Sequence, residues 1–345
     1  MGLNIRDIIP KTEIELESLK GKTICVDAFN TLYQFLSSIR QMDGTPLMDE
    51  QKRITSHLSG ILYRNAALLE QGIKLVYVFD GKAPDLKART HKKRKAAREL
   101  AGEKYEEAKQ DEDIMGMKRY SSQLVRLDDE MIRESKELLE AMGIAVVQAP
   151  SEGEAEAAFL AKNQEVYASA SQDYDSLLFG APLLIQNLTL ARKRKTISGY
   201  KEINPELIDL KKVLDRLEIS LDQLICLGIL VGTDYNPKGI PGIGQKKALQ
   251  IVQKYDSPVM IFKEMQEKIN SLPEEDKFDW QEIFYLFHKP DVIQAEIKFP
   301  KLNPEKIKEI LFEEHSFSEE RIDKQIERLK KVDEESKQTG LKKWF

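Results

Sequence analysis

The sequence is poor in cysteine and in long apolar runs, and each shortage excludes a class of protein. Among 345 residues there are two cysteines, Cys25 and Cys226, and both lie inside apolar runs. Such thiols are typical of a reducing compartment and exclude a disulfide-stabilised secreted scaffold. The longest apolar candidate, residues 224–231, is much shorter than the roughly 20 residues of a membrane span. Because Arg6 also interrupts any signal peptide, we expect a cytoplasmic protein with no membrane partner.

An excess of charge of one sign is lacking as well. The chain has 53 Lys and Arg against 58 Asp and Glu, a net charge of −5. This balance does not exclude a nucleic-acid partner, because acids at a metal site are neutralised there while basic groups gather elsewhere. With 41% hydrophobic and 32% charged residues, the chain can form one large or two medium domains with a packed core.

Short apolar runs alternate with helical patterns, such as that of residues 29–40. This alternation predicts an α/β fold with a mostly parallel, twisted central sheet and helices on both faces. The predicted strands are residues 22–27, 73–79, 144–147, 166–170 and 182–186.

Acidic residues follow the predicted strands. Asp27 and Asp80 end the first two, and Asp173 and Asp175 follow the fourth. Because the carboxyl ends of parallel strands meet at one crevice, we expect these side chains to converge. Clustered carboxylates repel one another unless cations lie among them, and oxygen ligands of this kind suit a pair of Mg²⁺ or Mn²⁺ ions.

Two further acids, Glu152 and Glu154, open the helix that follows the third predicted strand. Ser151 and Glu154 have the spacing of a capping box, which predicts that Ser151 caps this helix. The helix dipole alone also favours acids in a first turn, so helix stability is an alternative explanation of the two glutamates.

Residues 87–98 contain seven Lys or Arg and no acid. On a helix, Lys87, His91, Arg94 and Arg98 would share one face. The run starts seven residues after Asp80, so a polyanion in the acidic crevice would meet these cations; a solvated basic helix is the alternative. The charged residues 99–130 hold few apolar side chains, which predicts a mobile helical arch or lid beside the site.

The second half of the chain adds a basic hairpin, an acid and a glycine-rich turn. The hairpin is predicted at Arg192–Lys195, and a helix capped by Ser220 precedes Asp234. Gly239–Gly244 then opens another helix, whose first turn carries Lys246 and Lys247. Such a turn offers N–H groups and positive charge to a phosphate, although a plain turn between two helices is the alternative.

The C-terminal third is predicted to be helical, with Pro304 and Ser316 opening segments. One predicted helix carries its apolar face on Ile322, Ile326, Leu329 and Val332. The last residues are polar except for the final Trp-Phe pair, which indicates a partner protein.

These acids and motifs resemble the structure-specific 5′ nuclease superfamily and, within it, the flap endonucleases. The acids are Asp27, Asp80, Glu152, Glu154, Asp173, Asp175 and Asp234, and the motifs are Val78–Gly81, Glu152–Glu156, Ser171–Asp175 and Gly239–Gly244. The similarity runs from Met1 to about residue 258 and resumes at the last eight residues. Because the chain ends at Phe345 without the basic tail of nuclear members, an archaeal-type protein is expected.

The resemblance implies cleavage of 5′ flaps at junctions of single- and double-stranded DNA, with 5′ to 3′ exonuclease activity, in replication, where it processes Okazaki fragments, and in repair. It implies that the seven acids hold two Mg²⁺ ions, which Mn²⁺ can replace, for phosphodiester hydrolysis. It also implies that Lys87 and Arg94 contact the scissile phosphate and stabilise the charge of the transition state.

The resemblance further implies contacts with branched DNA and with a sliding clamp. Tyr33 would stack on a base, for which a core tyrosine is the alternative, and a K⁺ ion would lie on the carbonyls of the glycine-rich turn. Backbone contacts of this kind recognise the shape of DNA rather than its bases. The predicted DNA contacts are Gly2, Tyr33, Arg40, Arg64, Glu152, Gly239, Gly242, Gly244, Lys246 and Lys247, and the predicted clamp-binding box is Gln338, Leu341, Trp344 and Phe345.

We expect a monomer with consecutive functional regions. They are an N-terminal nuclease region with the start of the basic arch (1–102), an arch or lid (103–118), an internal nuclease region (119–258) with its helix-turn-helix turn (239–247), a C-terminal helical region packed on the core (259–332) and a flexible tail with the clamp box (333–345).

Two other functions fit parts of the sequence. One is a non-catalytic, clamp-bound module that recognises branched DNA, which the complete set of acids disfavours. The other is a metal-dependent phosphatase or glycosyltransferase whose Asp-x-Asp motif is Asp173–Asp175. That reading leaves the basic run, the glycine-rich turn and the terminal aromatics unexplained.

Overall fold

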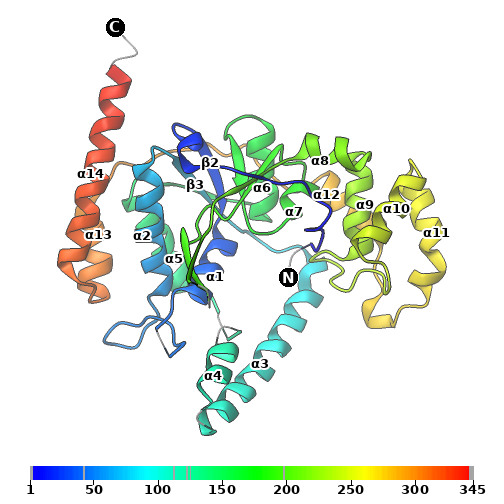
Figure 1. Cartoon of the computed structure of the whole chain (residues 1–345), viewed down its shortest axis with the longest axis horizontal. Helices are drawn as coiled ribbons and strands as arrows, with labels where there is room; N and C mark the ends of the chain where they lie inside the picture. The colour runs from blue at the N-terminus through cyan, green and yellow to red at the C-terminus, as the bar shows by residue number, and fades with distance from the viewer. Residues whose placement is uncertain are drawn as a thin grey trace.

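The computed structural model describes residues 3–41, 43–111, 113–121, 123–124, 126–196 and 199–341. Within these ranges a seven-stranded sheet has the strand order β1-β9-β6-β5-β2-β3-β4 and lies at the centre of the molecule (Figure 1). The strands are β1 (Thr12–Glu13), β2 (Thr23–Asp27), β3 (Lys74–Phe79), β4 (Ala145–Gln148), β5 (Ala168–Ala170), β6 (Leu183–Gln186) and β9 (Glu206–Asp209).

The five predicted strands correspond to β2 to β6 and run parallel to one another. The prediction of a mostly parallel α/β sheet is therefore confirmed. Two strands that the sequence did not predict extend one edge in antiparallel orientation, β9 against β6 and β1 against β9. Both are short and partly polar, so neither shows the apolar pattern by which a strand is found in a sequence.

Apolar side chains of the inner strands alternate between two faces of the sheet. Ile24 and Val26 pack with helices α1, α2 and α5, whereas Cys25 packs with α6 on the other face. Strands that are buried on both faces are continuous apolar runs, which explains why these strands could be predicted. The covering helices are α1 (Ala28–Ser38), α2 (Ser56–Glu70), α5 (Asp129–Ala141), α6 (Gly153–Lys162), α7 (Asp175–Leu178), α8 (Leu210–Leu217) and α9 (Leu221–Val231).

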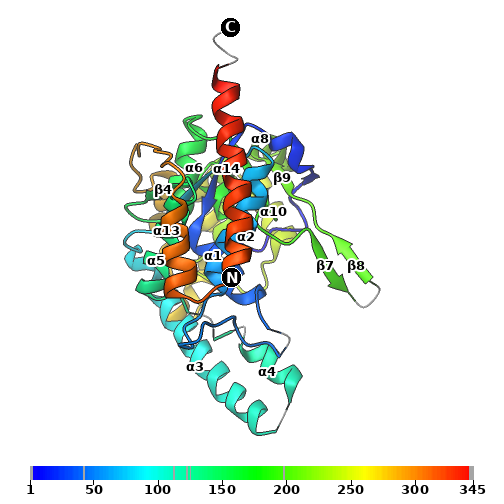
Figure 2. The ribbon, with the colours of Figure 1, turned by 90° about the vertical axis from the view of Figure 1, so that its left-hand side faces the viewer.

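The stretch predicted as a helical arch holds two helices, α3 (Ala88–Gln110) and α4 (Ile114–Ser121). They pack against each other and project from the body of the molecule (Figures 1 and 2). Arg40 donates hydrogen bonds to both the hydroxyl and the carbonyl oxygen of Ser121, at 3.0 and 3.1 Å, which ties the end of α4 to the loop after α1. The predicted basic hairpin is present as β7 (Lys193–Thr196) and β8 (Gly199–Glu202), which project from one side of the body (Figure 2).

The helices after α9 occupy two opposite ends of the molecule (Figure 1). One group, α10 (Gln245–Lys254), α11 (Pro258–Asn270) and α12 (Trp280–His288), packs with α9. The other group, α13 (Pro304–Lys308), the π-helical η4 (Glu309–Glu314) and α14 (Glu319–Leu341), packs with α2 and α5. Residues 259–332 are therefore divided between the two ends. The predicted boundaries of the functional regions stay a prediction.

The predicted helix starts in the C-terminal region are confirmed only in part. Pro304 occupies the first turn of α13, as predicted. Ser316 does not open α14, because it has a φ of +55° and lies in the turn that ends η4. The predicted apolar face of α14 is confirmed, since Ile322, Ile326 and Leu329 are buried. None of the helices in the described ranges is long and apolar enough to cross a membrane.

Two helical glycines should respond to alanine in opposite directions. A Cβ at Gly60 would lie 2.2 Å from the ring of the buried Phe35, whereas a Cβ at Gly102 would lie 3.7 Å from Leu124, an ordinary contact. We expect Gly60→Ala to lower the free energy of unfolding by about 1–3 kcal/mol through overpacking. Gly102→Ala should raise it by up to about 1 kcal/mol through helix propensity. Urea denaturation measures both, and equal shifts would contradict the packing of α2 on α1.

Candidate active site

The seven acids predicted to form one site are positioned by the ends of six different elements. Asp27 ends β2, Asp80 follows β3, and Asp173 lies in the loop after β5. The others stand at helix termini: Glu152 is the N-cap of α6, Glu154 lies in its first turn, Asp175 begins α7, and Asp234 follows α9. The parallel strands bring these ends to one edge of the sheet.

The electrostatics of the acids show that they lie close together. Burial and the negative charges of Asp80 and Asp173 raise the pKa of Asp27 to about 8. Burial and the charges of Asp234 and Asp173 raise the pKa of Asp175 to about 8. Burial raises the pKa of a carboxylic acid because the charged form loses hydration, and a neighbouring negative charge has the same effect.

Two further acids of the set have a raised pKa because of their neighbours. Burial raises the pKa of Glu154 well above its ordinary value, and Asp27, Asp175 and Asp173 raise it further. Burial also raises the pKa of Asp80, to which the charges of Glu152 and Asp234 contribute. The structure thus brings all seven predicted acids together in one crevice.

Lys87 lies among the acids, as predicted. Its Nζ is 2.7 Å from Oε1 of Glu152 and 3.6 Å from Oδ2 of Asp234, and it lies over the ring of Tyr235. Burial by itself would lower the pKa of Lys87, but the two acids raise it above its ordinary value. The alternative of a solvated basic face is therefore wrong for Lys87. It is wrong also that Lys87 shares an α-helical face, since it lies in the short helix η2 (Asp85–Lys87), just before α3.

The predicted capping box at Ser151 is wrong. The N-cap of α6 is Glu152, and no side chain caps it. Glu154 instead accepts a hydrogen bond of 2.8 Å from Ser171, and the amide of Gly153 donates one of 2.6 Å to Oδ1 of Asp80. The first N–H group of α6 is thus hydrogen-bonded to Asp80, which follows β3. A local sequence pattern cannot reveal a partner so distant in the chain.

Gly153 explains why a glycine separates the two glutamates. A Cβ at this position would lie 2.8 Å from Oδ1 of Asp80. Glycine therefore allows the carboxylate of Asp80 to reach the first N–H groups of α6, where the helix dipole favours a negative charge.

Two residues that the sequence interpretation missed hold the acids in place. Ser171 donates to Glu154 and accepts a hydrogen bond of 3.2 Å from the amide of Asp173. The side-chain amide of Asn30 donates a hydrogen bond of 3.0 Å to Oδ2 of Asp173, and its backbone N–H donates one to Oδ1 of Asp27. Their signal in the sequence is weak: each lies within three residues of an acid that follows a strand.

Two domain profiles match the chain. The XPG N-terminal domain matches residues 4–101 and the XPG I-region matches residues 143–234. Proteins named flap endonuclease 1 from Thermococcus onnurineus and Pyrococcus furiosus are each 50% identical to the chain over 347 residues, which is all of this chain and 99% of each relative. The chain belongs to the flap endonuclease family. The resemblance predicted from the motifs is therefore confirmed.

Solved structures agree with this membership. The flap endonuclease-1 from Methanococcus jannaschii is 39% identical and superposes with a TM-score of 0.74, covering 96% of this chain and 98% of that one. The catalytic core of Rad2 in complex with DNA substrate is 23% identical, with a TM-score of 0.69 over 95% of this chain and all of the other, and shares the fold.

The positions where the family resemblance predicts DNA contacts differ in their surroundings. Tyr33 is 38% exposed while Leu32 and Leu36 beside it are buried, so the alternative of a core tyrosine is wrong. Arg40 already binds the end of α4. Arg64 and Arg192 are both partly buried, which lowers the pKa of each. The positive charge of Arg64 lowers the pKa of Arg192 further.

The glycine-rich turn joins α9 and α10, which pack against each other. Gly239 has a φ of +54°, and a Cβ there would lie 2.3 Å from the carbonyl oxygen of Val231. Gly242 also has positive φ, at +76°, and Gly244 is the N-cap of α10. Lys246 and Lys247 are exposed in the first turn of that helix.

Several predicted site residues lie outside what the structure describes. They are Gly2, Trp344 and Phe345, together with the side chains of His91, Arg94, Gln338 and Leu341.

Removing one acid should change how stability depends on pH when divalent ions are absent. The pKa of Asp175 is about 8 in the folded chain against an ordinary 3.8, so the folded state holds the proton more tightly. Asp175 therefore contributes fully to the free energy of unfolding below about pH 4, and this contribution is lost as the pH rises towards 8. In a chelator, Asp175→Asn should therefore be more stable than the parent by more than about 1 kcal/mol at pH 8.

At low pH the difference should disappear. Thermal denaturation at both pH values measures the effect, and the exposed Asp256→Asn is the matched control. A constant difference at all pH values would contradict the mutual repulsion of the acids.

Proposed function

We propose that this chain, a member of the flap endonuclease family, cleaves 5′ flaps where single-stranded DNA joins a duplex, and removes nucleotides from 5′ ends. The observation that carries the proposal is the convergence of seven carboxylates and Lys87 in one crevice. In the cell this activity would remove flaps during replication, including those of Okazaki fragments, and during repair.

Nucleases of this family depend on divalent metal ions, and the residues of the crevice fit such ions. Every donor is a carboxylate oxygen, the ligand type of Mg²⁺ and Mn²⁺. Oδ1 of Asp175 is buried and accepts no hydrogen bond from the described residues, as expected for an atom reserved for a cation. We propose that two ions are held by the set Asp27, Asp80, Glu152, Glu154, Asp173, Asp175 and Asp234.

When bound, the ions activate the attacking water and stabilise the attacking and leaving oxygens. The chain supplies the positioning. Ser171 and Asn30 hold Glu154, Asp173 and Asp27 by hydrogen bonds. Lys87, fixed between Glu152 and Asp234, would hold a phosphate oxygen at the rim of the crevice and stabilise its growing charge. Arg94 is proposed as its partner from the family motif alone.

Recognition of DNA would use surfaces beside this crevice. Thr90, in the first turn of α3, donates a hydrogen bond to the backbone carbonyl of Asp234, which fixes the basic helix next to the acids. Arg64 and Arg192 lie close enough to repel each other, and a phosphate between them would relieve that repulsion. Tyr33 is exposed and available for stacking on a base.

We also propose that Lys246, Lys247 and the turn of Gly239, Gly242 and Gly244 hold the backbone of the duplex. Two lysines at a helix start, next to free N–H groups, suit a phosphate. A K⁺ ion on the carbonyl oxygens of the turn belongs to the same proposal, and a loss of duplex binding when Na⁺ replaces K⁺ would support it. Contacts of this type recognise the shape of branched DNA.

The central experiment measures cleavage of a labelled 5′-flap substrate with Mg²⁺ and with chelator. The parent should cut near the junction only when Mg²⁺ is present. Asp175→Ala should lower the rate by several orders of magnitude while the protein stays folded and still binds the flap. Binding without cleavage by the parent would instead favour the non-catalytic module that recognises branched DNA.

Loss of the Ser171 hydroxyl should weaken metal binding without removing any proposed ligand. We expect Ser171→Ala to need about 10–100-fold more Mg²⁺ for half-maximal cleavage, because outer residues that orient metal ligands contribute that much affinity. The maximal rate at saturating Mg²⁺ should largely recover. Ser176→Ala removes a buried hydroxyl that does not contact the acids and is the matched control; an unchanged Mg²⁺ requirement for Ser171→Ala would contradict the positioning role.

We propose that the C-terminal box Gln338, Leu341, Trp344 and Phe345 binds a sliding clamp. Support comes from the spacing of the motif and from the place of Gln338 and Leu341 in the last turns of α14, whose C-terminal end projects from the body (Figure 2). A chain that ends at residue 337 should cleave flaps normally but lose stimulation by the clamp. The monomeric state and the cytoplasmic location stay predictions of the sequence.

A further inference from the structure

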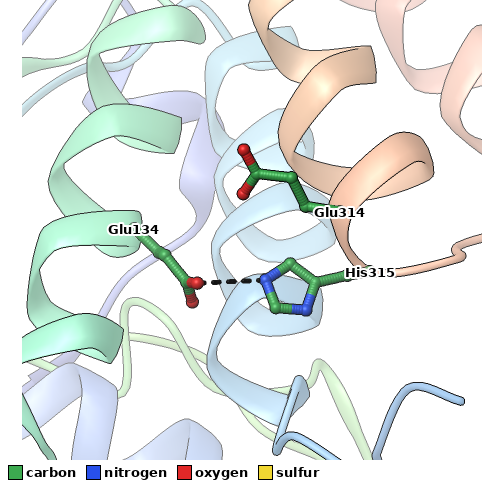
Figure 3. A group of neighbouring side chains, drawn as sticks. All are labelled: Glu134, Glu314 and His315. Atoms are coloured by element: carbon green, nitrogen blue, oxygen red, sulfur yellow. Dashed lines mark hydrogen bonds and ion pairs between the residues drawn. The ribbon is translucent and has the colours of Figure 1, made fainter. Parts of the chain in front are cut away.

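A second group of possible metal ligands lies away from the acidic crevice, among helices that the proposed function does not use. Glu134 of α5, Glu314 at the end of η4 and the adjacent His315 offer ligand atoms within 4.8 Å of one another. Figure 3 shows the carboxylate of Glu134 facing the imidazole of His315, with the side chain of Glu314 above them. Glu134 is 181 positions away from His315 in the sequence, so only the fold brings Glu134 to the other two residues.

His315 is oriented in the way that metal-bound histidines are. Its Nδ1 lies 2.9 Å from Oδ2 of Asp49, and its Nε2 lies 3.1 Å from Oε1 of Glu134. Asp49 is itself held by Arg53, whose Nε is 2.8 Å away, and Arg53 also donates a hydrogen bond to the backbone carbonyl of Glu314. A carboxylate that accepts the Nδ1–H of a histidine fixes its tautomer and leaves Nε2 as the ligand atom.

A buried histidine lies beside Glu134 of this group. His57 of α2 is fully buried, and neither of its ring nitrogens makes a hydrogen bond with the described residues. Its Nε2 lies 3.5 Å from Oε2 of Glu134, whereas Oε1 of the same carboxylate faces His315. A buried polar atom left unpaired costs about 1–3 kcal/mol, so an unpaired imidazole beside a carboxylate calls for a ligand.

We propose that Glu134, Glu314 and His315 bind a transition-metal ion of the Zn²⁺ class, with a water molecule as the fourth donor. Zinc is bound tetrahedrally at about 2.0–2.1 Å from nitrogen and oxygen, which places neighbouring ligand atoms about 3.3 Å apart. The separation of 3.1 Å between Nε2 of His315 and Oε1 of Glu134 is close to that value, and the ligand atoms of all three residues lie within 4.8 Å of one another.

The ligand chemistry separates this site from the acidic crevice. An imidazole together with two carboxylates suits Zn²⁺, whereas Mg²⁺ prefers oxygen ligands only and keeps several waters. Excess Mg²⁺ should therefore occupy the crevice and leave the histidine site to zinc. Arg133, whose Nη2 is 4.0 Å from Oε1 of Glu134, is half exposed and can move aside.

The position of the site gives it a structural role. It joins α2, α5 and the junction between η4 and α14, the region where the C-terminal helices pack on the N-terminal core. A metal bound there would stabilise that packing, since an ion that binds only the folded chain shifts the equilibrium towards it.

The test is titration of the whole protein with Zn²⁺ in excess Mg²⁺, followed by calorimetry and by thermal denaturation, with Co²⁺ absorption as a spectroscopic probe. The parent should bind one Zn²⁺ per chain and gain thermal stability. Asp49→Asn should weaken zinc binding by about 10–100-fold through loss of the orienting carboxylate, and Glu314→Gln should weaken it at least as much.

Glu314→Gln is the decisive variant, because its carboxylate makes no hydrogen bond or ion pair within the part of the chain that the structure describes, so the change should not disturb folding. Glu313→Gln, on the neighbouring exposed residue, and His288→Ala, which removes an exposed histidine, are the matched controls and should bind zinc like the parent. Loss of zinc binding in Glu314→Gln but not in the controls supports the site. Absence of zinc binding by the parent overturns the proposal, as does binding that Glu314→Gln leaves intact.

Discussion

The mutual repulsion of buried carboxylates is the constraint on which the rest of this structure depends. Parallel strands end at one edge of the sheet, so acids that follow different strands are forced into the same crevice. Burial and neighbouring charge raise the pKa of Asp27 and Asp175 to about 8, which means that the acids oppose one another's ionisation. The surrounding fold must supply the stability that this crevice lacks, and the apolar packing on both faces of the sheet does so.

Features around the crevice relieve that repulsion in different ways. Lys87 places a positive charge between Glu152 and Asp234, and the start of α6 directs the amide of Gly153 at Asp80. Ser171 and Asn30 add hydrogen bonds that fix the carboxylates without neutralising them. What remains is unbalanced negative charge held in a rigid arrangement, which is the environment that divalent cations require. The same geometry therefore makes the acids repel one another and gives the crevice its affinity for divalent cations.

The histidine-containing group at the C-terminal helices shows the opposite pattern. There the acids Asp49 and Glu134 are paired with His315, and Arg53 offsets further charge. Such a network stabilises the contact between distant segments of the chain, whereas the acids of the crevice repel one another. The two sites also differ in ligand type, so each can select its own metal.

The sequence by itself determined the inner strands, the acids and the glycine-rich turn, because buried parallel strands are continuous apolar runs and because the motifs of the family are local. It did not determine where α6 begins, since the group that satisfies its first amide is Asp80 from another strand. Nor could it show that Ser171 and Asn30 support the acids, or that residues 259–332 divide between two ends of the molecule. Tertiary structure decided these features, because each depends on which distant side chain meets a local group, and local spacing contains no information about that partner.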